Sequence, residues 1–199
     1  MVKANLFITS GATALLVGAL PAYAGDTYAG VTVGVAMPDS FDLDPVLNLD
    51  PDTSLLYGGF VGTSIASILR AEVEITHTSP TADCTGKCAS AEFDVAALTL
   101  LGNAWLDIPI GTTLSPYIGG GAGFGRTSVD DGVSGKESGW GFAYQLGGGV
   151  RWSPPTSNVA LDLGYRYKST NMDAADSPYV FADTDFTAHV FQASLSVGF

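Results

Sequence analysis

The sequence lacks long apolar runs, is poor in basic residues and contains only two cysteines. After residue 24, no stretch reaches the roughly 18 consecutive apolar residues of a membrane-spanning helix, which excludes a helical membrane protein. Eight lysines and arginines stand against 20 acidic residues, giving a formal net charge of −12. Such a chain has little with which to neutralise nucleic-acid phosphates, so we expect no nucleic-acid partner.

Motifs of catalysis and phosphate binding are also missing. The sequence contains no Gly-x-Ser-x-Gly turn and no His-Glu-x-x-His, and its glycine-rich stretch lacks the Lys-Ser/Thr ending of a phosphate-binding loop. We therefore predict a protein that is not an enzyme and that has no cofactor and no metal site.

The N-terminus predicts export. Lys3 precedes an apolar run through Leu20, and Ala22-Tyr23-Ala24 fits a small-x-small cleavage site. We predict a cleaved signal peptide over 1–24 and one mature domain over 25–199. The alternative is an uncleaved N-terminal anchor.

The two cysteines, Cys84 and Cys88, are separated by three residues in a polar stretch that contains glycine. In an exported chain, a small disulfide loop is the simplest prediction. A metal site is the alternative, but the nearest partners, His77 and Asp83, form no recognised ligand pattern.

Apolar and polar residues alternate over most of the mature chain. In 159–168, Val, Leu, Leu, Tyr and Tyr alternate with Ala, Asp, Gly, Arg and Lys, and 68–76 repeats the pattern. A period of two places the two kinds on opposite faces of a strand. No window has a convincing 3.6-residue period, so we predict an all-β chain. The eight predicted strands are 27–36, 54–63, 67–77, 91–106, 114–126, 138–152, 158–168 and 184–199.

The connections between these strands alternate in length. The connections after the first, third, fifth and seventh strands are long and polar, and the other three are shorter. Long loops at one end and short turns at the other are typical of outer-membrane barrels, with both termini at the short-turn end. A closed barrel also requires the first and last strands to pair, which satisfies every backbone group in lipid.

The composition of the polar row decides among a soluble barrel, a β-sandwich and a membrane barrel. A polar row facing water would be rich in large charged residues, but here it is mostly Gly, Ser, Thr and Ala. Such small residues suit the narrow interior of an eight-stranded barrel. The apolar rows of the predicted strands are expected to carry no Lys or Arg and to face lipid.

Aromatic residues near the strand ends are predicted to form a girdle at the membrane interface, where one end of the side chain is apolar and the other is wet. These residues are Trp105, Tyr117, Trp152, Tyr165, Tyr167 and Phe199.

Three segments resemble strands of a known family. Residues 100–107 resemble its Asn-Ala-Tyr-x-Asp strand, 115–123 its Pro-Tyr-x-Gly-x-Gly-x-Gly strand, and 161–167 its Leu-x-x-Gly-Tyr-Arg-Tyr strand. The chain is thus similar to the eight-stranded outer-membrane β-barrels of the OmpA-like, OmpX-like and opacity-type surface proteins. Phe199 matches the C-terminal aromatic residue of that family's barrel-assembly signal.

The resemblance implies a Gram-negative outer-membrane location. The implied partners are outer-membrane lipid, lipopolysaccharide and the barrel-assembly machinery. The chain stops at the barrel, so the peptidoglycan anchoring of OmpA itself is not expected.

Charged residues on the polar row form the main candidate site. Four positive and three negative side chains are expected to share the lumen, with Asn103, Gln145 and Gln192 as neighbours. Paired charges of both signs favour a self-neutralising polar plug, and an ion path or gate is the alternative. The seven residues are Arg70, Glu72, Glu74, Arg151, Asp162, Arg166 and Lys168.

We predict a closed antiparallel eight-stranded transmembrane β-barrel with a structural or surface-interaction role, whose four long loops contact an extracellular ligand. A small low-conductance channel through the lumen charges is one alternative. A lipid-modifying enzyme that uses His189 is the second, since some outer-membrane barrels modify lipid A with His and Ser. Acidic loop residues such as Asp42 and Asp50 offer oxygen ligands to a hard cation, although their spacing fits no calcium-binding loop.

Overall fold

A computed structural model describes most of the mature chain, and its regular structure is entirely β-strand. No helix among the described residues is long and apolar enough to cross a membrane. The predicted signal peptide over 1–24 lies outside these residues. The described residues are 27–39, 41–44, 47–86, 92–111, 113–130, 136–172 and 184–199.

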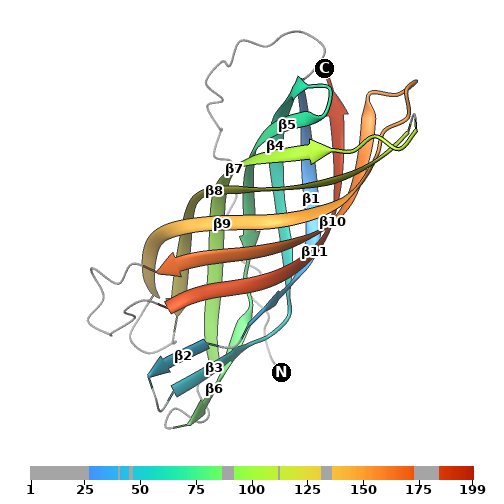
Figure 1. Ribbon diagram of the computed structural model, residues 1–199. Helices are drawn as coiled ribbons and strands as arrows, with labels where there is room; N and C mark the ends of the chain where they lie inside the picture. Colours follow the sequence, from blue (N-terminus) through green and yellow to red (C-terminus); the bar gives the residue numbers. More distant parts are fainter. Residues whose placement is uncertain are drawn as a thin grey trace, which may run out of the picture.

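Eight long strands form a closed antiparallel barrel (Figure 1). Each pairs with its neighbours in chain order, and the ring closes where β1 pairs with β11 from Tyr28↔Gly198 to Pro38↔Ala188. The predicted strands and the predicted closure are confirmed, with strand ends displaced by a few residues. The eight strands are β1 (Thr27–Pro38), β4 (Ser54–Ala66), β5 (Leu69–Thr78), β7 (Glu92–Asp107), β8 (Leu114–Asp130), β9 (Lys136–Trp152), β10 (Val159–Met172) and β11 (Thr184–Gly198).

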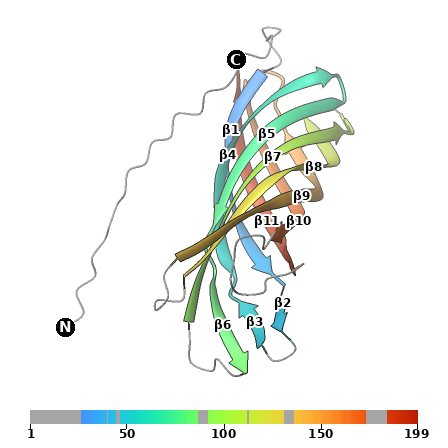
Figure 2. The same ribbon diagram turned by 90° about the vertical axis from the view of Figure 1, so that its left-hand side faces the viewer.

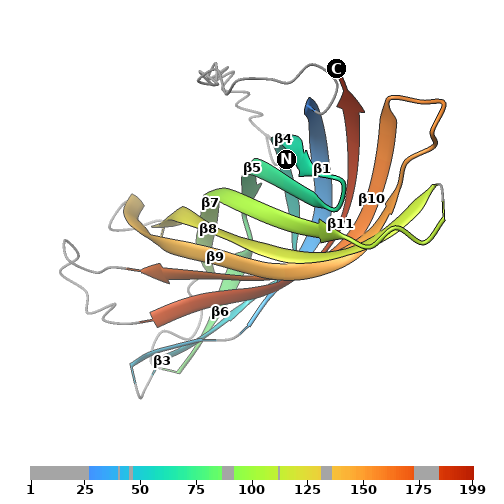
Figure 3. The same ribbon diagram turned by 45° about the horizontal axis from the view of Figure 1, so that its top comes forward.

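The two ends of the barrel differ. Tyr28 pairs with Gly198, so the start of β1 and the end of β11 lie at the same end of the barrel (Figure 3). The three short connections, over 67–68, 108–113 and 153–158, lie at this end. We call it the turn end, and we call the opposite end the loop end. Three of the four loop-end connections, over 39–53, 79–91 and 173–183, are longer than any at the turn end, but the connection over 131–135 is shorter than 108–113, so the predicted long loop is wrong there.

Three short strands extend the barrel wall at the loop end. They are β2 (Phe41–Asp44), β3 (Leu47–Pro51) and β6 (Thr81–Gly86). Strand β3 pairs with both β2 and β6, and β6 pairs with the first residues of β7, so the sheet continues past the rim (Figures 1 and 2). The prediction of plain loops here was incomplete, because these short strands depend on partners that are distant in the sequence.

The apolar row faces outward and the polar row faces inward. On β10, Leu163 is 58% exposed, whereas Asp162 and Arg166 are buried. On β11, Leu195 is 49% exposed and Ser194 is buried. This inversion of a soluble protein's pattern confirms the predicted membrane barrel and rules out the soluble alternatives, whose apolar rows point inward.

Candidate functional site in the barrel lumen

Arg70 lies at the centre of the charged groups near the turn end. Residues 70, 72 and 74 share the inward face of β5, so their side chains enter the same space. The Arg70 guanidinium donates to Asp107 twice, with Nε 2.6 Å from Oδ2 and Nη2 3.0 Å from Oδ1. Its Nη1 donates to Glu72 Oε1 at 2.8 Å. One cation therefore holds two carboxylates, the first in the bidentate geometry that Arg favours.

Neutral donors complete the environment of Glu72. The Tyr28 hydroxyl donates to Oε1 at 2.7 Å, and the Trp105 indole Nε1 donates to Oε2 at 2.7 Å. A separate ion pair joins Arg151 and Asp162 at 2.8 Å. These contacts satisfy charges that would be costly to bury alone.

Guanidinium groups and aromatic rings alternate across this part of the lumen. The rings stabilise buried positive charge, and Arg166 shows this most clearly. No carboxylate among the described residues lies within ion-pair distance of Arg166, and its guanidinium lies over the face of the Trp105 ring. Its Nη2 also donates to the Tyr117 hydroxyl at 3.1 Å. The order is Arg151, Tyr28, Arg70, Tyr117, Arg166 and Trp105, with successive guanidinium carbons and ring centroids 5.1, 6.0, 5.3, 5.2 and 4.1 Å apart.

Glycines make room for these large side chains. A methyl group on Gly119 would lie 2.7 Å from a ring carbon of Trp105. A methyl group on Gly164 would lie 2.6 Å from the Tyr117 hydroxyl. The glycine-rich inner face of β8, which the sequence showed as a Gly-x-Gly-x-Gly run, thus accepts bulk that neighbouring strands supply.

The ion pair of Lys168 and Glu74 lies toward the middle of the lumen. Lys168 Nζ is 2.8 Å from Glu74 Oε1 and donates to Thr76 Oγ1 at 3.0 Å. The buried Gln145 amide donates to Asn103 Oδ1 at 2.7 Å and lies 3.4 Å from Glu74. These groups separate the charged half of the lumen from the loop end.

Little space is left between these side chains. The turn-end cavity measures about 10 Å³, which is room for about one water molecule. The loop-end cavity measures about 30 Å³ and has a mainly aliphatic and threonine lining. Its lining includes Ala36, Leu56, Thr99, Thr170, Ala188 and Val190.

The structure places all seven predicted charged residues in the lumen, together with Asn103, Gln145 and Gln192. Asp107 is the member that the sequence missed, because it was assigned to the turn after its strand. With Asp107 the charged groups of the lumen number four cations and four carboxylates, of which Arg166 alone is in no ion pair among the described residues. The predicted excess of one positive charge was the signal that an acidic partner was missing.

The prediction of an aromatic girdle is wrong for two of its six residues. Trp105 is 1% exposed and Tyr117 is 5% exposed, so both belong to the lumen. The period of two already indicates this, since Trp105 is two residues from the inward Asn103. Trp152, Tyr165 and Phe199 do face outward, and Tyr167 is half-buried on the outer wall.

The expectation that the outward rows carry no Arg is also wrong. Arg126 is exposed and shares the outward row of β8 with Ile118 and Phe124. It stands at the last position of the predicted strand, near the loop end.

The remaining candidate residues lie away from the lumen. His189 is on the outer wall, where its Nδ1 is 2.6 Å from the Tyr165 hydroxyl. Phe199 follows β11, and its amide donates to the carbonyl of Thr27 at 2.9 Å. The backbone of Cys84 lies in β6, but Cys88 lies outside the described residues, and so does the predicted disulfide.

Comparison with known proteins identifies the family. A family model described as the outer membrane protein beta-barrel domain matches residues 10–199. The solved Neisserial surface protein A is similar, with 21% identity and a TM-score of 0.63 over 87% of this chain and 97% of that chain. OprG from Pseudomonas aeruginosa is similar, with 16% identity and a TM-score of 0.51 over 88% of this chain and 97% of that chain. A search of curated proteins found no match.

At these identities the two solved structures show a shared fold. The family model covers nearly the whole chain and agrees with the closed barrel and its outward apolar rows. The chain therefore belongs to the outer membrane protein β-barrel domain family and is an eight-stranded barrel of the Gram-negative outer membrane.

Proposed function

We propose that this barrel is a closed scaffold that presents an interaction surface at its loop end. The loop end faces the outside of the cell, and the turn end faces the periplasm, as the short-turn habit of outer-membrane barrels favours. Strands β2, β3 and β6 raise the wall on one side of the loop end (Figure 2). The role is passive: the wall anchors the protein in lipid, and a ligand contacts the four connections at the loop end.

The packed turn-end half of the lumen is the observation that supports this proposal. Ions would need a continuous aqueous path, and the guanidinium–aromatic stack leaves a cavity of about 10 Å³. Each cation there is held by a carboxylate or by an aromatic face, so opening a path would separate several buried partners at once. A scaffold needs no such opening.

A small channel is the alternative function, and planar-bilayer recording separates the two. We expect no steady openings from the wild-type barrel. The scaffold proposal fails if steady openings occur and are abolished in Arg166→Ala or Glu74→Ala, because those variants would then identify the lumen charges as the ion path.

A lipid-modifying enzyme is the second alternative, and the contacts of His189 disfavour it. The predicted chemistry requires a serine hydroxyl beside the imidazole, but Nδ1 is 2.6 Å from the Tyr165 hydroxyl and Nε2 is 3.6 Å from Asp39 Oδ1, so neither ring nitrogen is bonded to a serine. Profiling lipid A from cells that carry wild-type protein or His189→Ala tests this point. We expect identical profiles, and a change restricted to the variant would support the enzyme.

Phe199 is proposed to act in assembly by the barrel-assembly machinery, as the resemblance to the family's aromatic assembly signal implies. Its ring is 71% exposed, so removing it sacrifices little packing inside the barrel. We expect deletion of Phe199 to lower surface levels in cells while refolding in detergent is retained. Phe199→Tyr, which keeps the aromatic ring, is the matched control. Normal surface levels of the deletion variant would contradict the assembly role.

A further inference from the structure

Arg126 is the one lysine or arginine on the outer wall among the residues whose side chains the structure describes. A cation in an outward row is costly at the bilayer midplane and much less so near the interface. Its place along the strand is therefore informative. The outward row of β8 reads, toward the loop end, Ile118, Gly120, Ala122, Phe124, Arg126 and Ser128.

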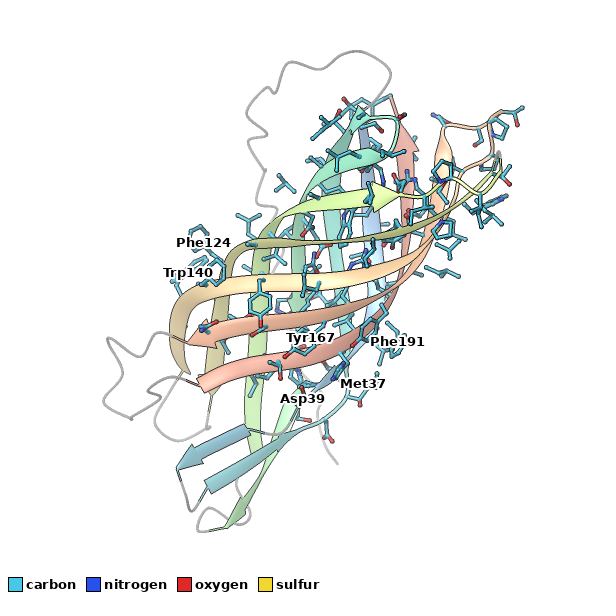
Figure 4. All side chains as sticks on the ribbon, in the orientation of Figure 1. Met37, Asp39, Phe124, Trp140, Tyr167 and Phe191 are labelled. Carbon is cyan, nitrogen blue, oxygen red and sulfur yellow. The ribbon has the colours of Figure 1, made fainter. Side chains whose placement is uncertain are left out.

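The neighbouring strand changes character at the same height. On β9, Phe142 and Trp140 are exposed on the outward row and Ser138 follows them. Arg126 pairs in register with Trp140, one step beyond the Phe124↔Phe142 pair toward the loop end. Phe124 and Trp140 lie close together on the wall (Figure 4). Both strands thus pass from apolar side chains to polar ones at this pair, which marks the boundary between acyl chains and headgroups.

The Arg126 side chain is held in place by the wall itself. Its guanidinium carbon lies 6.0 Å from the centroid of the Trp140 ring, and Nη2 donates to Ser138 Oγ at 2.9 Å. No carboxylate among the described residues is within ion-pair distance of it. The positive charge therefore lacks an anionic partner within the described wall, while its orientation is already fixed.

We propose that Arg126, Ser138 and Trp140 bind a phosphate group on the headgroup of an outer-leaflet lipid. A guanidinium can bind phosphate with two parallel hydrogen bonds, and the Ser138 hydroxyl adds a further polar contact. The indole places an amphipathic ring at the headgroup level. The proposal rests on the loop end facing outward.

The ligand is a lipid rather than free phosphate, because the surface next to Arg126 on its turn-end side is apolar. Phe124 is 63% exposed and Phe142 is 51% exposed, and this pair follows the Arg126–Trp140 pair toward the turn end. A molecule that binds both surfaces carries an anionic headgroup beside Arg126 and acyl chains beside Phe124 and Phe142. Phosphorylated lipid A has this chemistry.

Native mass spectrometry of the refolded barrel in detergent tests the site. The barrel is titrated with bis-phosphorylated lipid A and, separately, with the same lipid after enzymatic removal of its phosphates. We expect Arg126→Gln to bind the phosphorylated lipid about tenfold more weakly than wild type, as expected for the loss of a charge-assisted contact, and to bind the dephosphorylated lipid equally. The affinity of Arg126→Lys should lie between those of wild type and Arg126→Gln, because lysine keeps the charge but cannot form two parallel hydrogen bonds.

His189→Gln is the matched control, since it changes another polar side chain of the outer wall near the loop end and should bind like wild type. Heat-modifiable gel migration verifies that each variant is folded. Equal binding of the phosphorylated lipid by wild type and Arg126→Gln overturns the proposal. So does an equal loss for both lipids, or displacement of the lipid by inorganic phosphate at equal concentration. Lumen recordings do not involve Arg126, so failure of this site and failure of the scaffold proposal are distinguishable.

Discussion

The two halves of the lumen are filled by different kinds of side chain. Toward the turn end, charged groups and aromatic rings alternate around Arg70 and Arg166. Toward the loop end, a small apolar cluster replaces them, made of Ala36, Leu56, Ala188 and Val190. The boundary is the ion pair of Lys168 with Glu74.

This difference indicates which half keeps the lumen closed to water and ions. Side chains of the turn-end half are directional, since each must meet a specific donor, acceptor or ring, and so they hold one arrangement. Aliphatic side chains have no such partners and tolerate exchange among similar volumes. We infer that the turn-end half fixes the closed state and that the loop-end half mainly fills space.

Removing the central cation should have the largest effect. Arg70→Met leaves Glu72 and Asp107 without their shared partner, so we expect the free energy of unfolding to fall by about 3–5 kcal/mol. Urea unfolding in detergent micelles measures it. Leu56→Met in the loop-end half is the matched control and should cost below about 1.5 kcal/mol. Adding Glu72→Gln and Asp107→Asn to Arg70→Met should recover part of the loss. Equal losses in Arg70→Met and Leu56→Met would erase the distinction between the halves.

Filling the space that glycine leaves for the stack should have an intermediate effect. Gly119→Ala places a methyl group 2.7 Å from the Trp105 ring and against the backbone of Ala104, so we expect a loss of about 1–3 kcal/mol. Gly102→Ala is the control on the outward face of β7, where the nearest atom would be 3.8 Å away, and it should change stability by less than about 0.5 kcal/mol. The same unfolding assay compares them. If Gly119→Ala is tolerated as well as Gly102→Ala, the inner glycines are not needed for the stack.

Removing one hydroxyl toward the loop end should have the smallest effect. Thr76 and Thr99 share a hydrogen bond of 2.7 Å, and Thr99→Val removes it while keeping the shape of the side chain. Thr76 still accepts from Lys168, so we expect a loss of about 1 kcal/mol by urea unfolding. Thr99→Ser, which keeps the hydroxyl, separates the hydrogen bond from the loss of a methyl group. A loss in Thr99→Val as large as that of Arg70→Met would show that the loop-end half is equally directional.

The sequence predicted the barrel because its main determinant is local. Alternation in segments such as 159–168 places each residue on a face regardless of the rest of the chain. The composition of the polar row then decides which face is enclosed. Strands β2, β3 and β6 were missed because they are short and exist only through pairing with one another and with β7.

The candidate site was predictable in membership and less so in detail. The period of two along each strand places Arg70, Glu72 and Arg166 on inward faces, and therefore in one lumen. It does not say which carboxylate meets which cation, since that depends on register between strands. Asp107 was missed because the predicted strand ended at residue 106. In the structure Arg70 pairs with Trp105, and Asp107 stands two residues further on the same face of β7.

Two misplaced residue sets have a common cause. Trp105 and Tyr117 were assigned by residue type to a girdle, although parity places them inside. Arg126 continues the outward parity of β8 past Phe124, and it was overlooked because it ended the predicted strand. In both cases the period of two predicts the correct face, and the preference of a residue type does not.

Thiol labelling in the turn-end half tests the closed lumen most directly. Ser194 is 7% exposed and lines the turn-end cavity, whereas Ile108 is 51% exposed in a turn. Each is changed to cysteine in a Cys84→Ser/Cys88→Ser background and treated with a small water-soluble thiol reagent. We predict that Ile108→Cys reacts rapidly in the folded barrel and that Ser194→Cys reacts only after unfolding. Rapid labelling of Ser194→Cys in the folded barrel would mean that water and solutes fill the lumen, which contradicts the closed scaffold.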